Sequence, residues 1–132
     1  MSQEAVLRDV VDELRSRGSR YAREAYVFVV AALEVTAQQL ARPERRHISG
    51  GELTSGVIHI AREEFGPLAP TVFREWGVGT TEDIGTIVFE LVDAGQLSAR
   101  PDDTPADFVT GIDLAAALSA ATESGSGRGR DA

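Results

Sequence analysis

The sequence predicts a mainly α-helical domain with a small β-hairpin, and three observations lead to this fold class. Apolar residues recur at helical spacing in several long segments. Gly and Pro separate these segments at positions where helices commonly end. Near the C-terminus, two short segments rich in β-branched residues flank a turn-forming PDDTPA sequence. The chain has 132 residues, of which 42% are apolar and 26% charged, as expected for one globular domain.

The N-terminal part contains two predicted helices, at about 3–17 and about 20–41. The first helix carries one apolar stripe and ends near Gly18. The second has a middle that is apolar nearly all round, AYVFVVAALEV at 25–35, and it ends before Pro43. A helix of this kind is usually buried on several sides, so we expect it to be the central helix.

Three further helices are predicted at about 50–65, 68–76 and 81–94. Ser49 and Glu52 have the spacing of a capping box at the start of the first. The second is short and places Pro70 in its first turn, where a missing N–H costs little. The third has the clearest apolar period in the chain, with Thr80 or Thr81 as its N-cap.

The order of the later elements resembles that of a winged helix-turn-helix. Two strands are expected at 97–100 and 107–112, and a last helix follows at about 114–121. Helix 81–94 then holds the recognition position, and residues 100–107 form the wing. The predicted organisation is one domain at 1–118, a helical part at 3–42, a winged-helix-like part at 48–112 and a disordered tail at 119–132.

Several sequence segments also resemble a family of small uncharacterised bacterial proteins. These segments are RHISGGEL at 46–53, FGPLA at 65–69, EWGV at 75–78 and EDIGTIVF at 82–89. Asp107 and Phe108 fit the same pattern. The resemblance implies that residues 21–112 form one folded unit, and it implies no catalytic residue, cofactor or partner.

Charge is distributed unevenly along the chain. The formal net charge is −8, from 21 acids and 13 bases, and every base is an arginine. Residues 1–46 carry 8 Arg and 7 acids, for a net +1. Residues 47–99 carry 2 Arg and 8 acids, for a net −6, and residues 100–132 carry 3 Arg and 6 acids, for a net −3. The last two thirds are therefore a poor ligand for a polyphosphate.

Helix 81–94 has no basic residue on the side away from its apolar stripe, which argues against DNA binding through it. We expect that side to contact another protein with a basic surface instead. Phe89 lies off the stripe, and we expect the central helix to cover it, with Gly85 allowing that helix to approach closely. The protein-contact candidates are Glu82, Asp83, Thr86, Phe89, Glu90 and Asp93.

A second candidate site is an anion-binding corner at the start of helix 50–65. Two guanidinium groups next to a helix N-terminus can hold an anion, and adjacent glycines admit it to the backbone. The competing interpretation is that Ser49 and Glu52 already satisfy those amides. The anion-binding candidates are Arg45, Arg46, His47, Ser49, Gly50 and Gly51.

Three function classes follow from these patterns. A non-enzymatic protein-interaction or regulatory module is favoured, because no catalytic constellation and no cofactor-binding motif is present. An enzyme or binder of a small anionic ligand would use Arg46, His47 and Ser49. A nucleic-acid-binding regulator would use the N-terminal arginines, which are Arg15, Arg17, Arg20, Arg23, Arg42, Arg45 and Arg46.

The remaining expectations concern metals, compartment and assembly. No cysteine is present, and His47 and His59 lack metal-ligand spacing, so no metal site is predicted. No signal peptide or membrane-spanning segment is visible, so a cytoplasmic protein is expected. Trp76 is expected to anchor the core, and a homodimer remains open.

Overall fold

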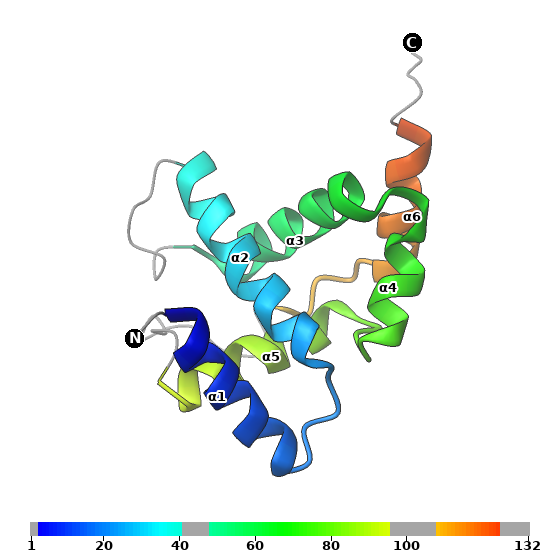
Figure 1. Ribbon diagram of the computed structural model, residues 1–132. Helices are drawn as coiled ribbons and strands as arrows, with labels where there is room; N and C mark the ends of the chain where they lie inside the picture. Colours follow the sequence, from blue (N-terminus) through cyan, green and yellow to red (C-terminus); the bar gives the residue numbers. More distant parts are fainter. Residues whose placement is uncertain (1–2, 41–47, 96–107, 125–132) are drawn as a thin grey trace.

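The computed structural model describes residues 3–40, 48–95 and 108–124. Within these residues all regular secondary structure is helical. Figure 1 shows the helices in chain order, with α2 and α3 crossing near the centre. The elements are α1 Gln3–Ser16, α2 Arg23–Gln39, α3 Gly50–Phe65, the 3-10 turn η2 Gly66–Leu68, α4 Ala69–Glu75, α5 Thr81–Asp93 and α6 Leu114–Ser124.

The predicted helices are confirmed, with small differences in their ends. The largest difference is at α2, which begins at Arg23 instead of residue 20. The residues before it bond to other elements instead. The Ala22 amide donates to the Trp76 carbonyl at 3.1 Å, and the Arg20 and Tyr21 side chains bond Asp83 at the start of α5. At the C-terminal end, α6 runs to Ser124, so residues 119–124 are helical and do not belong to a disordered tail. Residues 125–132 lie outside the described residues.

The β-hairpin and the winged-helix sheet are corrected by the structure. No strand occurs within 3–40, 48–95 or 108–124. The Phe108 ring packs into the space beside Gly85. The Phe108 carbonyl accepts a hydrogen bond from the Thr81 hydroxyl at 2.7 Å. Gly111 then turns the chain with φ +74°. This segment therefore packs through one aromatic anchor and not through a strand ladder. The expected first strand at 97–100 and the whole of the wing at 100–107 fall on residues that are not described.

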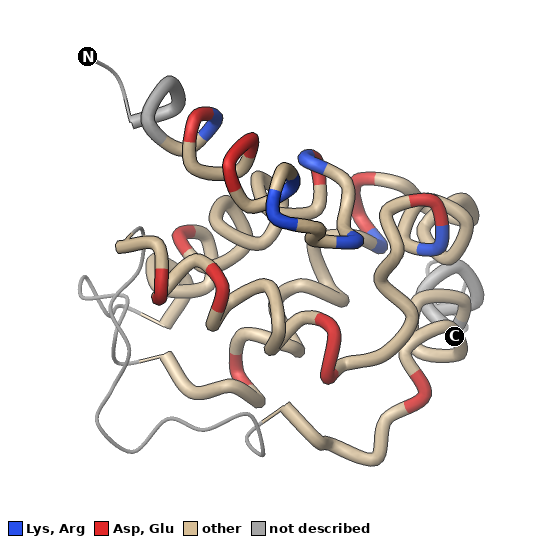
Figure 2. The backbone as a smooth tube through the Cα atoms, turned by 90° about the horizontal axis from the view of Figure 1, so that it is seen from below, with Lys and Arg blue, Asp and Glu red and all other residues tan. Residues whose placement is uncertain are grey.

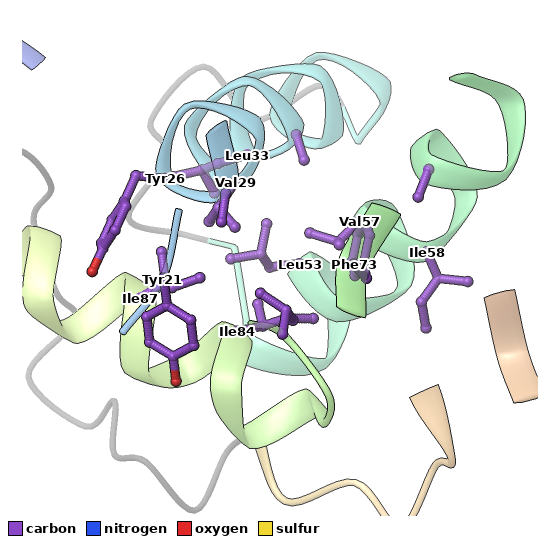
Figure 3. Close-up of a cluster of buried hydrophobic side chains, with 14 of the residues drawn as sticks. Tyr21, Tyr26, Val29, Leu33, Leu53, Val57, Ile58, Phe73, Ile84 and Ile87 are labelled. Atoms are coloured by element: carbon purple, nitrogen blue, oxygen red, sulfur yellow. The ribbon is translucent and has the colours of Figure 1, made fainter. Parts of the chain in front are cut away.

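One hydrophobic core joins all six described α-helices. Fully buried residues from the predicted stripes meet there, including Val57 of α3 and Ile84, Ile87 and Leu91 of α5. Figure 3 shows Ile84 and Ile87 near Leu53, with Tyr21 and Tyr26 at the edge of the cluster. The two tyrosine rings are buried, while their hydroxyl groups are directed away from the apolar side chains.

Glycine sets the distance between α2 and α3 at their crossing. A Cβ atom at Gly56 would overlap the hydroxyl of Thr36 on α2. Thr36 and Thr54 are both buried, and their hydroxyl groups have no hydrogen-bond partner. The two helices thus approach closely because residue 56 has no side chain.

The expectation that Trp76 anchors the core is consistent with its surroundings. Its half-buried ring stacks on Phe73 at a centroid distance of 5.4 Å and lies 5.5 Å from Phe28 and 5.7 Å from Phe65. These four rings tie α2, the end of α3 and α4 together. Aromatic pairs at such distances contribute roughly 0.5–1.5 kcal/mol each beyond the area they bury.

Candidate protein-contact site

Helix α5, which carries the predicted contact residues, begins with a capping box. The Thr80 hydroxyl accepts from the Asp83 amide at 3.2 Å, and Oδ2 of Asp83 accepts from the Thr80 amide at 3.1 Å. The Gly79 amide donates to the same Oδ2 at 2.8 Å. Thr80 is therefore the N-cap, and the Asp83 carboxylate satisfies two amides that precede the helix.

Asp83 also receives hydrogen bonds from the segment that connects α1 to α2. The Tyr21 hydroxyl donates to Oδ1 of Asp83 at 2.7 Å, and the Arg20 guanidinium pairs with the same oxygen. Burial opposes ionisation of this carboxyl group, but the hydrogen bonds from Tyr21, Gly79, Arg20 and Thr80 outweigh it and lower its pKa. Asp83 is only 7% exposed, so the structure removes it from the outward side of the helix.

Glu90 makes a second link between α5 and the N-terminal part. The Tyr26 hydroxyl lies 2.6 Å from Oε1 of Glu90 and is also hydrogen-bonded to the Ser19 hydroxyl. Burial of the Tyr26 ring, followed by its hydrogen bond to the Glu90 carboxylate, raises the pKa of the phenol. Glu90 is half-buried and already has a partner, so it serves first to hold α2 against α5.

Three residues remain on the outward side of α5, and we call them the outer α5 stripe: Glu82, Thr86 and Asp93. All three are exposed, and their spacing places them along one side of the helix. The Thr86 hydroxyl donates to the Glu82 carbonyl at 3.1 Å. The carboxylates of Glu82 and Asp93 therefore supply the main chemistry of the outer α5 stripe. Neither carboxylate forms an ion pair with a described arginine or histidine.

Phe89 is covered, but by a different element from the one expected. Its ring packs edge-on against Phe108 with the centroids 6.1 Å apart. The close approach that Gly85 permits is also made by Phe108, because a Cβ at Gly85 would lie 2.7 Å from that ring. The prediction that the central helix covers Phe89 is therefore wrong, and the residue that follows the undescribed segment does so.

The anion-binding corner is only partly within the described residues. Arg45, Arg46 and His47 lie outside them, as does Arg42. At the start of α3 the predicted capping box is confirmed: Ser49 accepts from the Glu52 amide, and Glu52 accepts from the Ser49 amide, both at 3.0 Å. Gly50 is buried and Gly51 is exposed. Two of the amides that an anion would need are thus already occupied.

The described N-terminal arginines are mostly held by neighbouring carboxylates. Arg17 pairs with Glu13 at 2.5 Å, Arg23 pairs with Asp12 at 2.5 Å, and Arg20 pairs with Asp83. Arg15 is exposed at the end of α1. Each ion pair reduces the positive charge that a phosphate backbone would meet, so this arrangement does not favour the nucleic-acid alternative.

Metal, pocket and membrane features add no competing site in the part of the chain that is described. No group of three or more His, Cys, Asp or Glu side chains comes close enough to hold a metal ion. His59 lies 3.4 Å from Glu63 on the surface of α3. A shallow apolar groove of about 340 Å³ lies between α4 and α6, with Phe73 and Leu114 among its lining residues. None of the described helices is both long and apolar enough to cross a membrane.

The link from Arg20 and Tyr21 to Asp83 is the main feature that the sequence analysis did not anticipate. A partial signal was present: Asp83 stands three residues after Thr80, which is the N3 position of a capping box. An acid at N3 turns back toward the helix start and away from the solvent-facing stripe. Its pairing with Tyr21 joins residues 62 positions apart, and no local pattern encodes such a contact.

Comparison with protein-family models, curated protein sequences and solved structures gave no match to this chain. The resemblance to a family of small bacterial proteins therefore stays a prediction.

Proposed function

We propose that this chain is a non-enzymatic protein-interaction module that binds a partner with a basic surface through the outer α5 stripe. The observation that carries the proposal is that Glu82 and Asp93 are exposed and form no ion pair with the described residues. Carboxylates in this state keep their full charge for steering and orienting a positively charged partner.

The wider distribution of charge supports the same surface. Helices α5 and α6 contain no arginine, and Asp113 before α6 is exposed. In Figure 2 the arginines gather in the upper part of the view, while the lower part carries only acidic positions. A partner that approaches the acid-only side meets no described positive charge, so its own basic groups are attracted without competition.

The structure also narrows the set of residues that can contact the partner. Asp83 and Glu90 hold the fold together through Tyr21 and Tyr26, so their charges are already engaged. Phe89 packs on Phe108 and offers only part of its ring. The proposed contact therefore depends on Glu82 and Asp93, with Thr86 between them.

A pair of charge reversals tests this proposal. The variant carries Glu82→Arg and Asp93→Arg, and the matched control carries Glu64→Arg and Glu75→Arg, which are exposed on α3 and α4. Each double variant changes the net charge from −8 to −4, so the two differ only in where the charge changes. Both should keep the helical circular dichroism spectrum, because none of the four residues is buried.

The readout is quantitative affinity capture from a native lysate, followed by binding measurements on each captured protein. We expect at least one partner that the wild type and the control retain and that the α5 variant binds about tenfold more weakly or worse. That binding should weaken as salt is added. Equal recovery of every partner by both double variants would contradict the proposal.

A further inference from the structure

Helix α2 is the most apolar helix of the N-terminal part, yet one side of it is left uncovered. Val27 is 46% exposed and Val35 is 37% exposed, and Ala31 between them is exposed as well. The prediction that this helix is buried on several sides holds for the sides that pack on α1, α3 and α5. A three-residue apolar stripe remains on the opposite side.

The stripe continues at both ends into polar residues on the same side of the helix. Residues at i, i+3, i+7, i+11 and i+14 share one side, within about 40° of the central residue at 100° per residue. We call this set the outer α2 face: Glu24, Val27, Ala31, Val35 and Gln38, all of which are exposed. Neither Glu24 nor Gln38 has a side-chain hydrogen bond or ion pair with the described residues.

The outer α2 face is complementary to itself in one orientation only. In an antiparallel pair centred on Ala31, Val27 of one copy lies level with Val35 of the second copy, because each is four residues from the centre. The same register places Glu24 level with Gln38, whose side-chain amide can donate to the carboxylate. A parallel pair would instead place Glu24 beside Glu24, which is repulsive.

We infer that two copies of this chain pair antiparallel through the outer α2 face, with Ala31 at the crossing point. The small side chain of Ala31 lets the two helices approach closely, and distances between packed helix axes depend on the side chains at the contact. Such a two-fold interface uses the same residues on both copies. The face is narrow, so we expect a dimer that dissociates in the roughly micromolar range.

This dimer is independent of the proposed partner site. Helix α5 packs on a different side of α2 from the exposed stripe, so pairing through α2 leaves Glu82 and Asp93 uncovered on both copies. The α5 charge-reversal variant should therefore dimerise as the wild type does. Failure of one proposal does not affect the other.

Cysteine cross-linking tests both the surface and the orientation, because the natural chain contains no cysteine. With Ala31→Cys we expect a disulfide-linked dimer to form readily, since residue 31 meets itself at the crossing point. A mixture of Val27→Cys and Val35→Cys should cross-link, whereas either alone should cross-link much less. Ser55→Cys, exposed on α3, is the control for random collision.

Sedimentation of the full chain supplies a second readout that does not depend on cysteine. From about 1 to 300 µM we expect the wild type to shift from 14.1 kDa toward twice that mass. Val27→Glu with Val35→Glu should abolish the shift. Val109→Glu with Ile112→Glu, at two exposed apolar positions elsewhere, should leave it unchanged.

Three outcomes would overturn the inference. Efficient cross-linking of Val27→Cys alone would show a parallel pair. A wild type that stays at 14.1 kDa at 300 µM, with Ala31→Cys cross-linking no faster than Ser55→Cys, would show that no second copy occupies this face. A dimer that survives the Val27→Glu and Val35→Glu changes would place the interface elsewhere.

Discussion

The two ends of α5 are held by similar chemistry with different consequences. At each end a tyrosine hydroxyl from the N-terminal part donates to a carboxylate of α5: Tyr21 to Asp83 and Tyr26 to Glu90. Asp83 additionally accepts from two backbone amides and pairs with Arg20, so the negative charge itself is stabilised there. At the other end the partners of Tyr26 are Glu90 and Ser19, and none of them is positively charged.

This difference shows that a buried tyrosine–carboxylate pair does not have a fixed role. Where amides and a guanidinium group converge, the pair favours the ionised acid and lowers its pKa, as at Asp83. At both ends burial and the neighbouring carboxylate raise the pKa of the phenol, and the effect is larger at Tyr26, which has no cation beside it. Three measurements can break or sharpen this contrast.

The largest effect is expected from removing the two carboxylates one at a time. Asp83→Ala should lower the free energy of unfolding by about 3 kcal/mol, because it removes the acceptor of the Gly79 and Thr80 amides and leaves the buried Tyr21 hydroxyl without its acceptor. Glu90→Ala should cost only about 1 kcal/mol, since Ser19 still bonds the Tyr26 hydroxyl. Urea unfolding followed by circular dichroism measures both, and equal losses would show that the two ends are equivalent.

A smaller effect is expected from removing the two hydroxyl groups. Tyr21→Phe and Tyr26→Phe should each cost about 1 kcal/mol at neutral pH. In alkali they should differ in extent: the folded-state pKa of both phenols is raised, more at Tyr26 than at Tyr21, so each contribution is present below pH 10 and is lost as pH rises above it, with the larger loss at Tyr26. The stability difference between wild type and Tyr26→Phe should therefore shrink above pH 10, and a difference independent of pH would contradict the assigned environment.

The third measurement is the dependence of stability on acid. The pKa of Asp83 is lowered below the 3.8 of an unperturbed aspartate, so the folded protein binds this proton less readily than the unfolded chain. Its contribution to stability is present above pH 3.8 and is lost as pH falls through the folded-state value. The stability difference between wild type and Asp83→Asn should shrink below about pH 4.

The sequence predicted local structure well where one face of a helix decides it. Ile84, Ile87 and Leu91 of the predicted stripe are fully buried, the capping box at Ser49 has the expected form, and Thr80, one of the two expected N-caps, caps α5. Such features depend on neighbours within four residues, which the sequence displays directly.

The sequence failed where a distant contact overrides a local pattern. Residues 108–112 have the composition of a strand, but Phe108 packs into the space at Gly85 and its carbonyl bonds the Thr81 side chain. Asp83 has the position of a surface acid in the helical period, but Tyr21 and Arg20 cover it from 62 and 63 positions away. For the same reason, only three of the six predicted contact residues on α5 are fully exposed on its outward side.

The link between Tyr21 and Asp83 also bears on the order of folding. Closing a loop of 62 positions costs chain entropy before the Tyr21–Asp83 hydrogen bond can stabilise the fold. The turns and caps of each helix, in contrast, form from residues close in sequence. We therefore expect the α1–α2 connection to dock onto the start of α5 after the transition state. Substitutions at this link should then accelerate unfolding and leave the refolding rate nearly unchanged. The Tyr21–Asp83 contact would in that case control the lifetime of the native state through the unfolding rate.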